Sequence, residues 1–271
     1  MKQGLLWIKS LNWLALISFC LLLAGFGLAV REILGPETNR NMAGIKPPPS
    51  VPSEGLLLGL GDSLTRGVGD KNGLGYFGII KKRWHASSHN RSRAINLSIR
   101  GQTSQNLREQ FNKGQTRQFV KEADTIVITI GGNDLFRESR DIEQLDIRTI
   151  KERKKQFTEN LDAILSEIHR LNPKCSVYLF SLYDPFGDLS DSERTSAIVA
   201  DWNHATIVTA LPFDQVTVVP VYDLFHKNPR LYLYSDHFHP NDKGYQKMAD
   251  RLWQVMNTAE PEVNSPHAVR N

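Results

Sequence analysis

The stretch that decides the fold is Leu56-Leu-Leu-Gly-Leu-Gly-Asp-Ser-Leu-Thr65. The run of leucines over residues 56–60 is typical of a strand buried on both faces of a parallel sheet. Ser63 follows at a predicted strand-to-helix turn, which can present the serine hydroxyl and N–H to a ligand at the positive end of a helix. The alternative role for Ser63 is a helix N-cap. Asp62 is expected to brace this turn rather than to carry protons.

Short apolar runs and longer amphipathic segments alternate along the rest of the chain. The short runs, which predict strands buried on both faces of a parallel sheet, are residues 56–60, 94–99, 125–130, 176–182 and 216–221. A helix is predicted from the spacing of Phe157, Leu161, Ile164, Leu165, Ile168 and Leu171, and a final helix from Tyr245, Met248, Leu252 and Val255. Ser190 and Glu193 resemble a capping box at the start of a further helix, which carries Ile198 and Trp202. The pattern predicts an α/β fold, a doubly wound, flavodoxin-like five-stranded parallel sheet in three α/β/α layers, with strand order 2-1-3-4-5.

Three polar or glycine positions follow the first three predicted strands. Ser63 follows strand one, Gly101 follows strand two, and Asn133 follows strand three in the word Gly131-Gly132-Asn133-Asp134. In this strand order they converge at the carboxyl edge of the sheet, where α/β folds bind ligands. The stretches 135–146 and 183–190, with Phe136 and Phe186, are expected to border the pocket there. The Asn133 amide can donate to a developing oxyanion, and the Gly101 N–H can do so without an obstructing side chain. Alone, Asn133 also fits an Asx turn and Gly101 an ordinary turn glycine.

A base and its carboxylate partner are predicted in Asp236-His237-Phe238-His239-Pro240. Residues three apart on a turn can face one way, so Asp236 can bond one ring nitrogen of His239 and leave the other for Ser63. This is the Ser…Asp…His arrangement of serine hydrolases. His237 competes for the role, but only His239 has the carboxylate three residues earlier and the proline after it.

Together these sequence motifs resemble the consensus blocks of the SGNH hydrolases, also called GDSL esterases and lipases, over about residues 55–257. The resemblance implies a serine esterase or lipase that hydrolyses carboxylic esters through an acyl-enzyme, without metal or other cofactor, on a small-molecule ester or lipid. It implies Ser63, Asp236 and His239 as the catalytic triad and Ser63, Gly101 and Asn133 as the oxyanion hole. The second block, Ile99–Thr103, matches mainly through its glycine. The N-terminal segment is similar to that of membrane-anchored, lipase-like proteins of spore-forming Gram-positive bacteria.

Two rival functions remain open from the sequence. Asp236, His237 and His239 have metal-ligand spacing, as do His85 and His89, so a metal-dependent hydrolase is the first rival. The second is a non-catalytic lipid- or cell-wall-binding module on a hydrolase scaffold.

The first 54 residues of the sequence predict a tether. Residues 11–30 are nearly all apolar, and twenty helical residues span ~30 Å, the thickness of the bilayer core. Lys2 and Lys9 precede the run, which predicts a cytoplasmic N-terminus and an extracytoplasmic catalytic domain at the cell membrane. The protein is secreted if the segment is instead a cleaved signal peptide. The predicted organisation is an anchor or signal segment (1–34), a proline-rich linker (35–54), the hydrolase domain (55–257) and a loose tail (258–271).

Charge and cysteine content exclude some classes of function. The net charge is +4, but without Lys2 and Lys9 the chain carries 31 basic and 29 acidic residues. This balance argues against a nucleic-acid partner. Cys20 and Cys175 lie in an apolar segment and at a predicted buried strand, so no disulfide is expected. The oligomeric state is not readable from the sequence.

Overall fold

The structure covers the predicted catalytic region. The computed structural model describes four stretches, residues 55–87, 92–136, 146–186 and 192–258. All four belong to one compact unit of the chain. The predicted anchor, the linker and, apart from Thr258, the tail lie outside the described residues. No helix within the described stretches is both long and apolar enough to span a bilayer.

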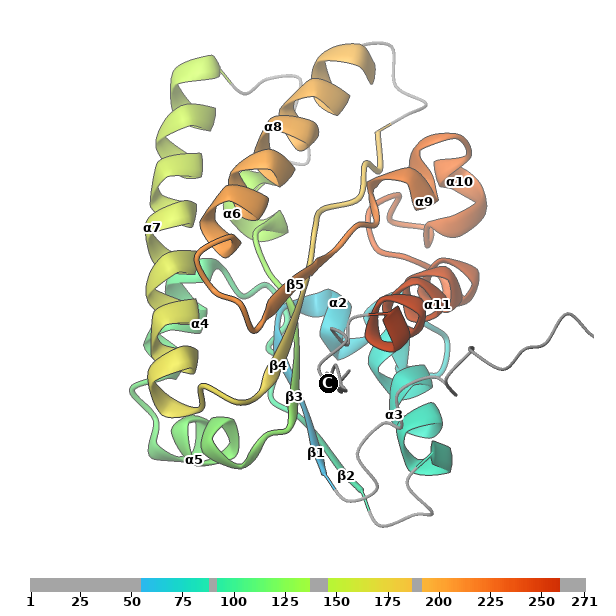
Figure 1. The fold of residues 1–271 in the computed structure, drawn as a ribbon. Helices are drawn as coiled ribbons and strands as arrows, with labels where there is room; N and C mark the ends of the chain where they lie inside the picture. The colour runs from blue at the N-terminus through green and yellow to red at the C-terminus, as the bar shows by residue number, and fades with distance from the viewer. Residues whose placement is uncertain (1–54, 88–91, 137–145, 187–191, 259–271) are drawn as a thin grey trace, which may run out of the picture. The chain divides into compact units, whose positions relative to one another are not determined.

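Five parallel strands form one sheet in the order β2-β1-β3-β4-β5 (Figure 1). The predicted flavodoxin-like order is therefore confirmed. The strands are β1 (Leu56–Gly61), β2 (Arg93–Asn96), β3 (Thr125–Thr129), β4 (Ser176–Phe180) and β5 (Val216–Val219).

The sheet differs from the prediction at its carboxyl edge and at its two outer strands. β2 to β5 each end before the predicted apolar run does, because the chain leaves the regular ladder there to form loops. Ile99 N, for example, still donates to Gly61 O at 2.8 Å. β1 and β3 are buried throughout, whereas β2 and β5 are mostly half-buried. The expectation that all five strands are buried on both faces is wrong for β2 and β5, because an edge strand has a neighbour on one side only.

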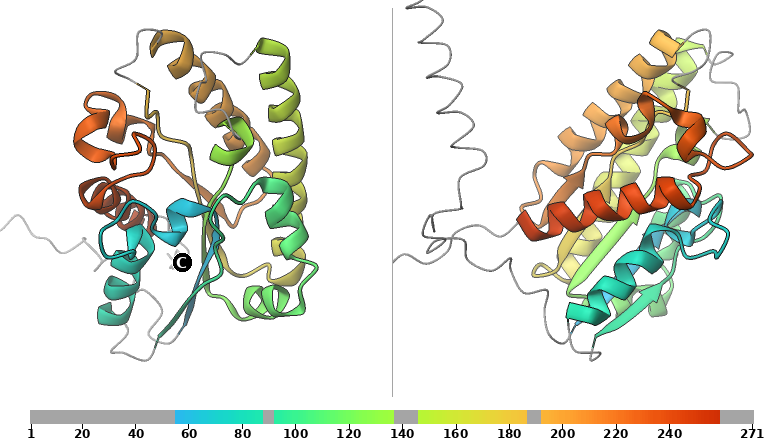
Figure 2. Two further views of the ribbon diagram at one scale, coloured as in Figure 1. Left: turned by 180° about the vertical axis from the view of Figure 1, so that it is seen from behind. Right: turned by 90° about the vertical axis from the view of Figure 1, so that its right-hand side faces the viewer.

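Helices cover both faces of the sheet, which confirms the three layers (Figures 1 and 2). Each interface has its own apolar cluster. In one, Phe157 packs against Trp202 with ring centroids 4.8 Å apart, and in the other Tyr76 packs against Phe180 with ring centroids 4.6 Å apart. One layer holds α4 (Ser104–Gln110), α5 (Gly114–Glu122), α7 (Ile147–Leu171) and α8 (Ser192–Ala210). The other holds α3 (Gly75–Ser87), α9 (Tyr222–His226) and α11 (Asp242–Thr258). The short helices are α2 (Ser63–Arg66), α6 (Gly132–Phe136) and α10 (Pro229–Tyr232).

The two long helices predicted from apolar spacing are confirmed. In α7 the predicted stripe is buried apart from half-buried Leu171, and the helix begins where the Asp146 carboxylate accepts from Thr149 N at 2.9 Å. In α11 the predicted residues are buried except half-buried Val255. The described part of α8 begins at Ser192, and Ser190, from which the capping box is predicted, lies outside the described residues.

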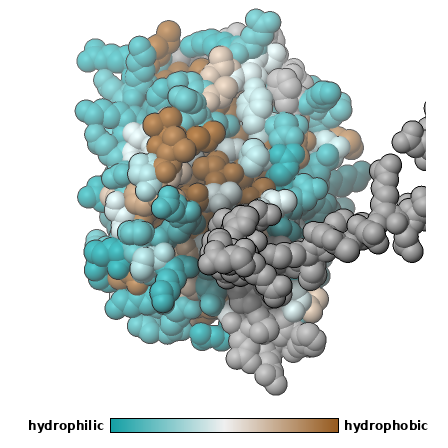
Figure 3. Space-filling view, viewed as in Figure 1, coloured by the Kyte–Doolittle hydropathy of each residue, from teal (hydrophilic) through white to brown (hydrophobic). Residues whose placement is uncertain are grey.

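Hydrophobic residues also gather on the outer surface over α8 (Figure 3). The exposed large hydrophobic side chains here are Ile207 and Val208 on α8 and Leu211, which directly follows the helix.

Glycines mark the points where β1 and β3 turn toward the site. Gly61 has φ +106°, and a Cβ there would lie 1.9 Å from the Thr129 carbonyl oxygen. Gly131 has φ +109°, and a Cβ there would lie 2.8 Å from the Phe157 ring. Both positions therefore require glycine, for backbone conformation and for space.

Replacing Gly61 by Ala is expected to lower the free energy of unfolding by about 3 kcal/mol or more, because the methyl group meets backbone that cannot move aside. Urea denaturation measures the change. The control is Gly114→Ala at the start of α5, where no atom lies within 4 Å of the added carbon. That variant is expected to be as stable as the wild type or up to ~1 kcal/mol more stable. Equal free energies of unfolding for the two variants would contradict the conclusion that position 61 requires glycine.

Candidate active site

Ser63 sits at the first position of α2, directly after β1. The N-cap is Asp62, whose side chain accepts from Leu64 N at 3.0 Å. The sequence left open whether Ser63 itself caps the helix, and the structure gives that role to Asp62. The Ser63 hydroxyl is thereby left for another partner.

A buried chain of hydrogen bonds fixes this turn against β3. Thr129 Oγ1 donates to Asp62 Oδ1 at 2.7 Å. Thr65 Oγ1 lies 2.7 Å from Thr129 Oγ1 and 2.5 Å from the Tyr76 hydroxyl. Asn96 Nδ2 on β2 donates to Thr65 O at 2.7 Å. The turn is therefore tied to both strands that flank β1 and to α3.

Asp62 is an unusual carboxylic acid because it is fully enclosed. Burial raises its pKa to about 7, and the nearby Asp134 carboxylate acts in the same direction. The hydrogen bonds from Thr129 and Leu64 act against this rise. Asp62 therefore changes its charge near neutral pH, where an exposed aspartate is fully ionised.

His239 lies between Ser63 and Asp236. Its Nε2 is 2.9 Å from Ser63 Oγ and its Nδ1 is 2.6 Å from Asp236 Oδ2. The other Asp236 oxygen accepts from the backbone N–H groups of Phe238 and His239 at 3.0 and 2.9 Å. Partial burial acts to raise the pKa of Asp236, but these hydrogen bonds outweigh it and the pKa is lowered. Asp236 therefore stays ionised at neutral pH and fixes the imidazole orientation.

His237, the competing histidine, occupies the turn of the same loop. It has φ +56° and an exposed side chain. The loop is held from two sides, since the Tyr183 hydroxyl donates to Phe238 O at 2.5 Å and Tyr234 N donates to His239 O at 2.7 Å. Tyr183 was not assigned this role from the sequence, because no local pattern links residues 183 and 238.

Asn133 and Gly101 lie on adjoining loops. Asn133, in α6, donates one amide hydrogen to Gln102 O at 2.9 Å and keeps a second for a ligand. Gly101 has φ +74°. Within the described part of the chain, the backbone N–H groups of Ser63 and Gly101 donate no hydrogen bond. Asp134 ties the two loops together by accepting from Ser104 N at 2.9 Å and Ser104 Oγ at 2.5 Å.

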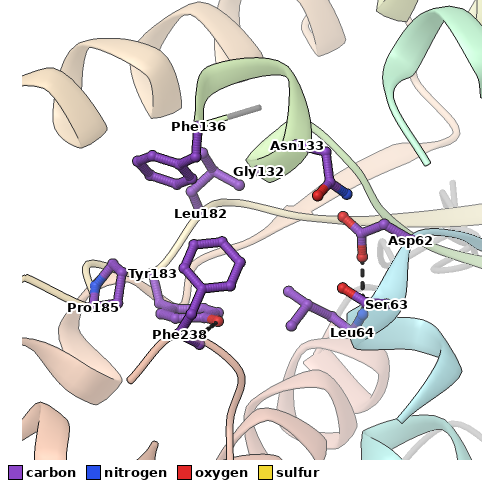
Figure 4. Close-up of a pocket in the computed structure, with 10 residues that line it drawn as sticks. All are labelled: Asp62, Ser63, Leu64, Gly132, Asn133, Phe136, Leu182, Tyr183, Pro185 and Phe238. Atoms are coloured by element: carbon purple, nitrogen blue, oxygen red, sulfur yellow. Dashed lines mark hydrogen bonds between the residues drawn. The ribbon is translucent and has the colours of Figure 1, made fainter. Parts of the chain in front are cut away.

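An apolar pocket opens beside Ser63 and Asn133 (Figure 4). The polar groups lie at one end, and the opposite end is aromatic and aliphatic. The enclosed space is small, about 20 Å³. Phe136 and Tyr183 belong to segments that the sequence placed at the pocket, whereas Leu182 and Phe238 were missed. Phe186, also expected there, packs edge-on against Phe136 instead. The apolar lining is Leu64, Phe136, Leu182, Tyr183, Pro185 and Phe238.

The metal alternative finds little geometric support. No group of three or more His, Cys, Asp or Glu side chains among the described residues is arranged to hold a metal ion. Both ring nitrogens of His239 contact Asp236 and Ser63. His85 Nδ1 lies 3.0 Å from Ser92 Oγ, and His89 lies outside the described residues.

Comparison with known proteins gives one consistent result. Residues 60–247 match the family described as GDSL-like Lipase/Acylhydrolase. The uncharacterized protein YpmR of Bacillus subtilis is 32% identical over 206 residues, covering 74% of this chain and 81% of YpmR. The spore germination lipase LipC of Bacillus licheniformis is 27% identical, covering 71% of this chain and 92% of LipC. The crystal structure of the lipase Lip_vut3 from a goat rumen metagenome is 25% identical, covers 74% of this chain and 97% of its own, and has a TM-score of 0.67.

The pKa of Asp62 predicts a pH-dependent effect of Asp62→Asn, which keeps an acceptor for Leu64 and Thr129. An unfolded aspartate has a pKa of about 3.9, so between that value and about 7 the folded wild type holds a proton that unfolding releases. Wild-type stability therefore falls as pH rises through this window. The stability of the variant relative to wild type is expected to rise by up to about 1.4 kcal/mol per pH unit there and to level off above pH 7.

Urea denaturation of both proteins between pH 4 and 8 measures this difference. A difference that is constant over the range would show that Asp62 is already ionised near its ordinary pKa.

Proposed function

The chain belongs to the GDSL-like Lipase/Acylhydrolase family and is a carboxylic ester hydrolase, and we propose that Ser63, His239 and Asp236 are its catalytic triad. The observation that carries the proposal is the continuous contact from Ser63 Oγ through the His239 ring to the Asp236 carboxylate, at 2.9 and 2.6 Å. A serine hydroxyl is a weak nucleophile alone and needs an adjacent base that is itself oriented.

In the proposed reaction, His239 Nε2 takes the hydroxyl proton as Ser63 Oγ attacks the ester carbonyl carbon. The Ser63 and Gly101 N–H groups and the Asn133 amide stabilise the oxyanion that forms on the carbonyl oxygen. The carbonyl reforms, the bond to the alcohol oxygen breaks, and the proton passes from His239 to that oxygen. A water molecule then repeats the steps on the acyl-enzyme and releases the acid. Asp236 stays ionised and stabilises the imidazolium.

The apolar pocket beside Ser63 is proposed to take the acyl part of the ester. Its lining offers carbon surface and no charged side chain beyond Asp62 at its polar end. Its small volume admits only the first atoms of a chain without movement of the walls, since one water-sized sphere needs ~10–15 Å³. The substrates that this supports are esters of apolar acids.

Replacing Ser63 by Ala is expected to lower kcat for p-nitrophenyl acetate or butyrate by about 10⁴–10⁶-fold, because the covalent route is lost. Ser87→Ala, at the exposed end of α3, is the matched control and should retain wild-type rates. A folded Ser63→Ala variant with unchanged turnover would refute the mechanism.

Replacing Asn133 by Ala is expected to lower kcat by ~10²–10³-fold with little change in KM, because the lost donor acts on charge that develops only in the transition state. Steady-state kinetics separate the two constants, and circular dichroism checks the fold, since Asn133 also bonds Gln102. A rise in KM at constant kcat would mean that Asn133 binds the ground state and is no oxyanion donor.

The catalytic domain is further proposed to be extracytoplasmic and tethered to the cell membrane through the apolar run at residues 11–30. The support is the sequence pattern alone, with Lys2 and Lys9 before the run. Mass spectrometry of the N-terminus of the protein purified from the cell membrane is expected to find residues 1–34 retained. A mature form in the medium that begins after this segment would mean secretion.

A further inference from the structure

One wall of the apolar pocket beside Ser63 is fixed by α8. Leu182 N donates to Asn203 Oδ1 at 2.7 Å, and Asn203 Nδ2 donates to Leu182 O at 2.8 Å. The Asp184 carboxylate accepts from Ser196 Oγ at 2.5 Å. Asn203 and Ser196 both belong to α8, so the segment after β4 is bonded to a long helix at two points. A ligand cannot push this wall back without breaking these hydrogen bonds.

A second wall of the pocket belongs to α6 and is also fixed. Phe136 contributes its ring to the lining and is 5% exposed. The same helix carries Asn133, and Arg153 on α7 donates to Leu135 O at 2.8 Å. Movement of this wall would therefore displace the proposed oxyanion donor as well.

Phe238 contributes the part of the lining that can move. Phe136 and Tyr183, the other two aromatic residues of the lining, are buried, whereas Phe238 is half-buried. Its backbone is held, since the Tyr183 hydroxyl donates to Phe238 O at 2.5 Å and Phe238 N donates to Asp236 Oδ1 at 3.0 Å. The phenyl ring carries no such group and is held by packing alone. The ring can therefore change rotamer while the backbone of the catalytic loop stays in place.

In the structure the Phe238 ring closes the pocket. It stands among the other lining side chains (Figure 4) and forms T-shaped contacts with Phe136 and His239, at ring-centroid distances of 5.5 and 5.3 Å. The space left beside Ser63 is about 20 Å³, roughly the room of one or two water-sized spheres. The methyl group of an acetyl ester matches such a space, and a longer acyl chain meets the ring.

We propose that the ring of Phe238 sets the length of the acyl group that the enzyme accepts. In its observed position the ring admits a short acid, and a longer acid binds only after the ring has turned out of the pocket. The turn breaks the contacts with Phe136 and His239, so a longer ester gains less than its added carbon surface would supply. The proposal rests on the proposed function, because it takes the acyl group to enter this pocket, and it names the residue that selects among acids there.

The test measures kcat/KM for p-nitrophenyl acetate, butyrate and hexanoate. Replacing Phe238 by Ala is expected to raise the ratio of kcat/KM for hexanoate to that for acetate by about 10-fold or more. The reason is that each methylene group buried in the opened space contributes about fourfold. Phe238→Leu, which removes less of the side chain, should raise the same ratio by a smaller factor.

Phe186→Leu is the matched control for Phe238→Leu. Phe186 packs against the same Phe136 ring, with centroids 5.2 Å apart, but is not part of the pocket lining. This variant should keep the wild-type ratio of hexanoate to acetate. An equal rise in Phe186→Leu would overturn the proposal, because the effect would then come from loosened packing around Phe136.

An unchanged ratio in a folded Phe238→Leu variant would also overturn the proposal, even if Phe238→Ala proved too unstable to measure. Circular dichroism checks the fold of each variant.

Failure of the proposed function gives different results. If Ser63 is not the nucleophile, Ser63→Ala retains turnover on all three esters. If the pocket takes the alcohol instead of the acid, Phe238→Ala raises kcat/KM for hexyl acetate relative to ethyl acetate and leaves the ratio of the p-nitrophenyl esters unchanged.

Discussion

The hydrogen bond from Thr129 Oγ1 to the buried Asp62 carboxylate connects the two halves of the site. It joins the turn that carries Ser63 to the end of β3, and Asn133 follows four residues later. Thr65 and Tyr76 extend this connection into the second helical layer. A carboxylate enclosed in this way is unfavourable when ionised, as its raised pKa indicates. Stability is therefore lowered at neutral pH while the turn that carries Ser63 is held in one position.

Much of the fold was predictable because its signals are local. Buried apolar runs identified five strands, and chain order with right-handed crossovers gave the sheet order. The motifs at residues 61–65, 131–134 and 236–240 predicted which loops come together at the carboxyl edge of the sheet. The side chains that support the site were not predictable in the same way. Thr129 and Tyr183 act through partners 67 and 55 residues away, and single-sequence patterns carry no information about such pairs. The strand ends were overestimated because an apolar run does not show where the ladder stops.

Two different surfaces lie near the Ser63 hydroxyl. Aromatic and aliphatic side chains from the loops after β3, β4 and β5 form the pocket beside Ser63. The loop after β2 and the adjacent α4 form a second cavity, next to Gly101, which has several polar and charged side chains in its lining. Asn133 stands between them, since it lines the first and bonds the backbone of the second. The family scaffold explains the chemistry, whereas the fold alone does not choose the substrate.

The central claim is that the Ser63 hydroxyl, activated by His239, is the nucleophile. Labelling of the active protein with a fluorophosphonate, followed by peptide mass spectrometry, tests it most directly. The account predicts a single phosphonyl adduct on Ser63, with hydrolysis lost in proportion to labelling, and slow labelling of a His239→Ala variant. An adduct on another residue, or full inactivation with Ser63 unmodified, would contradict it.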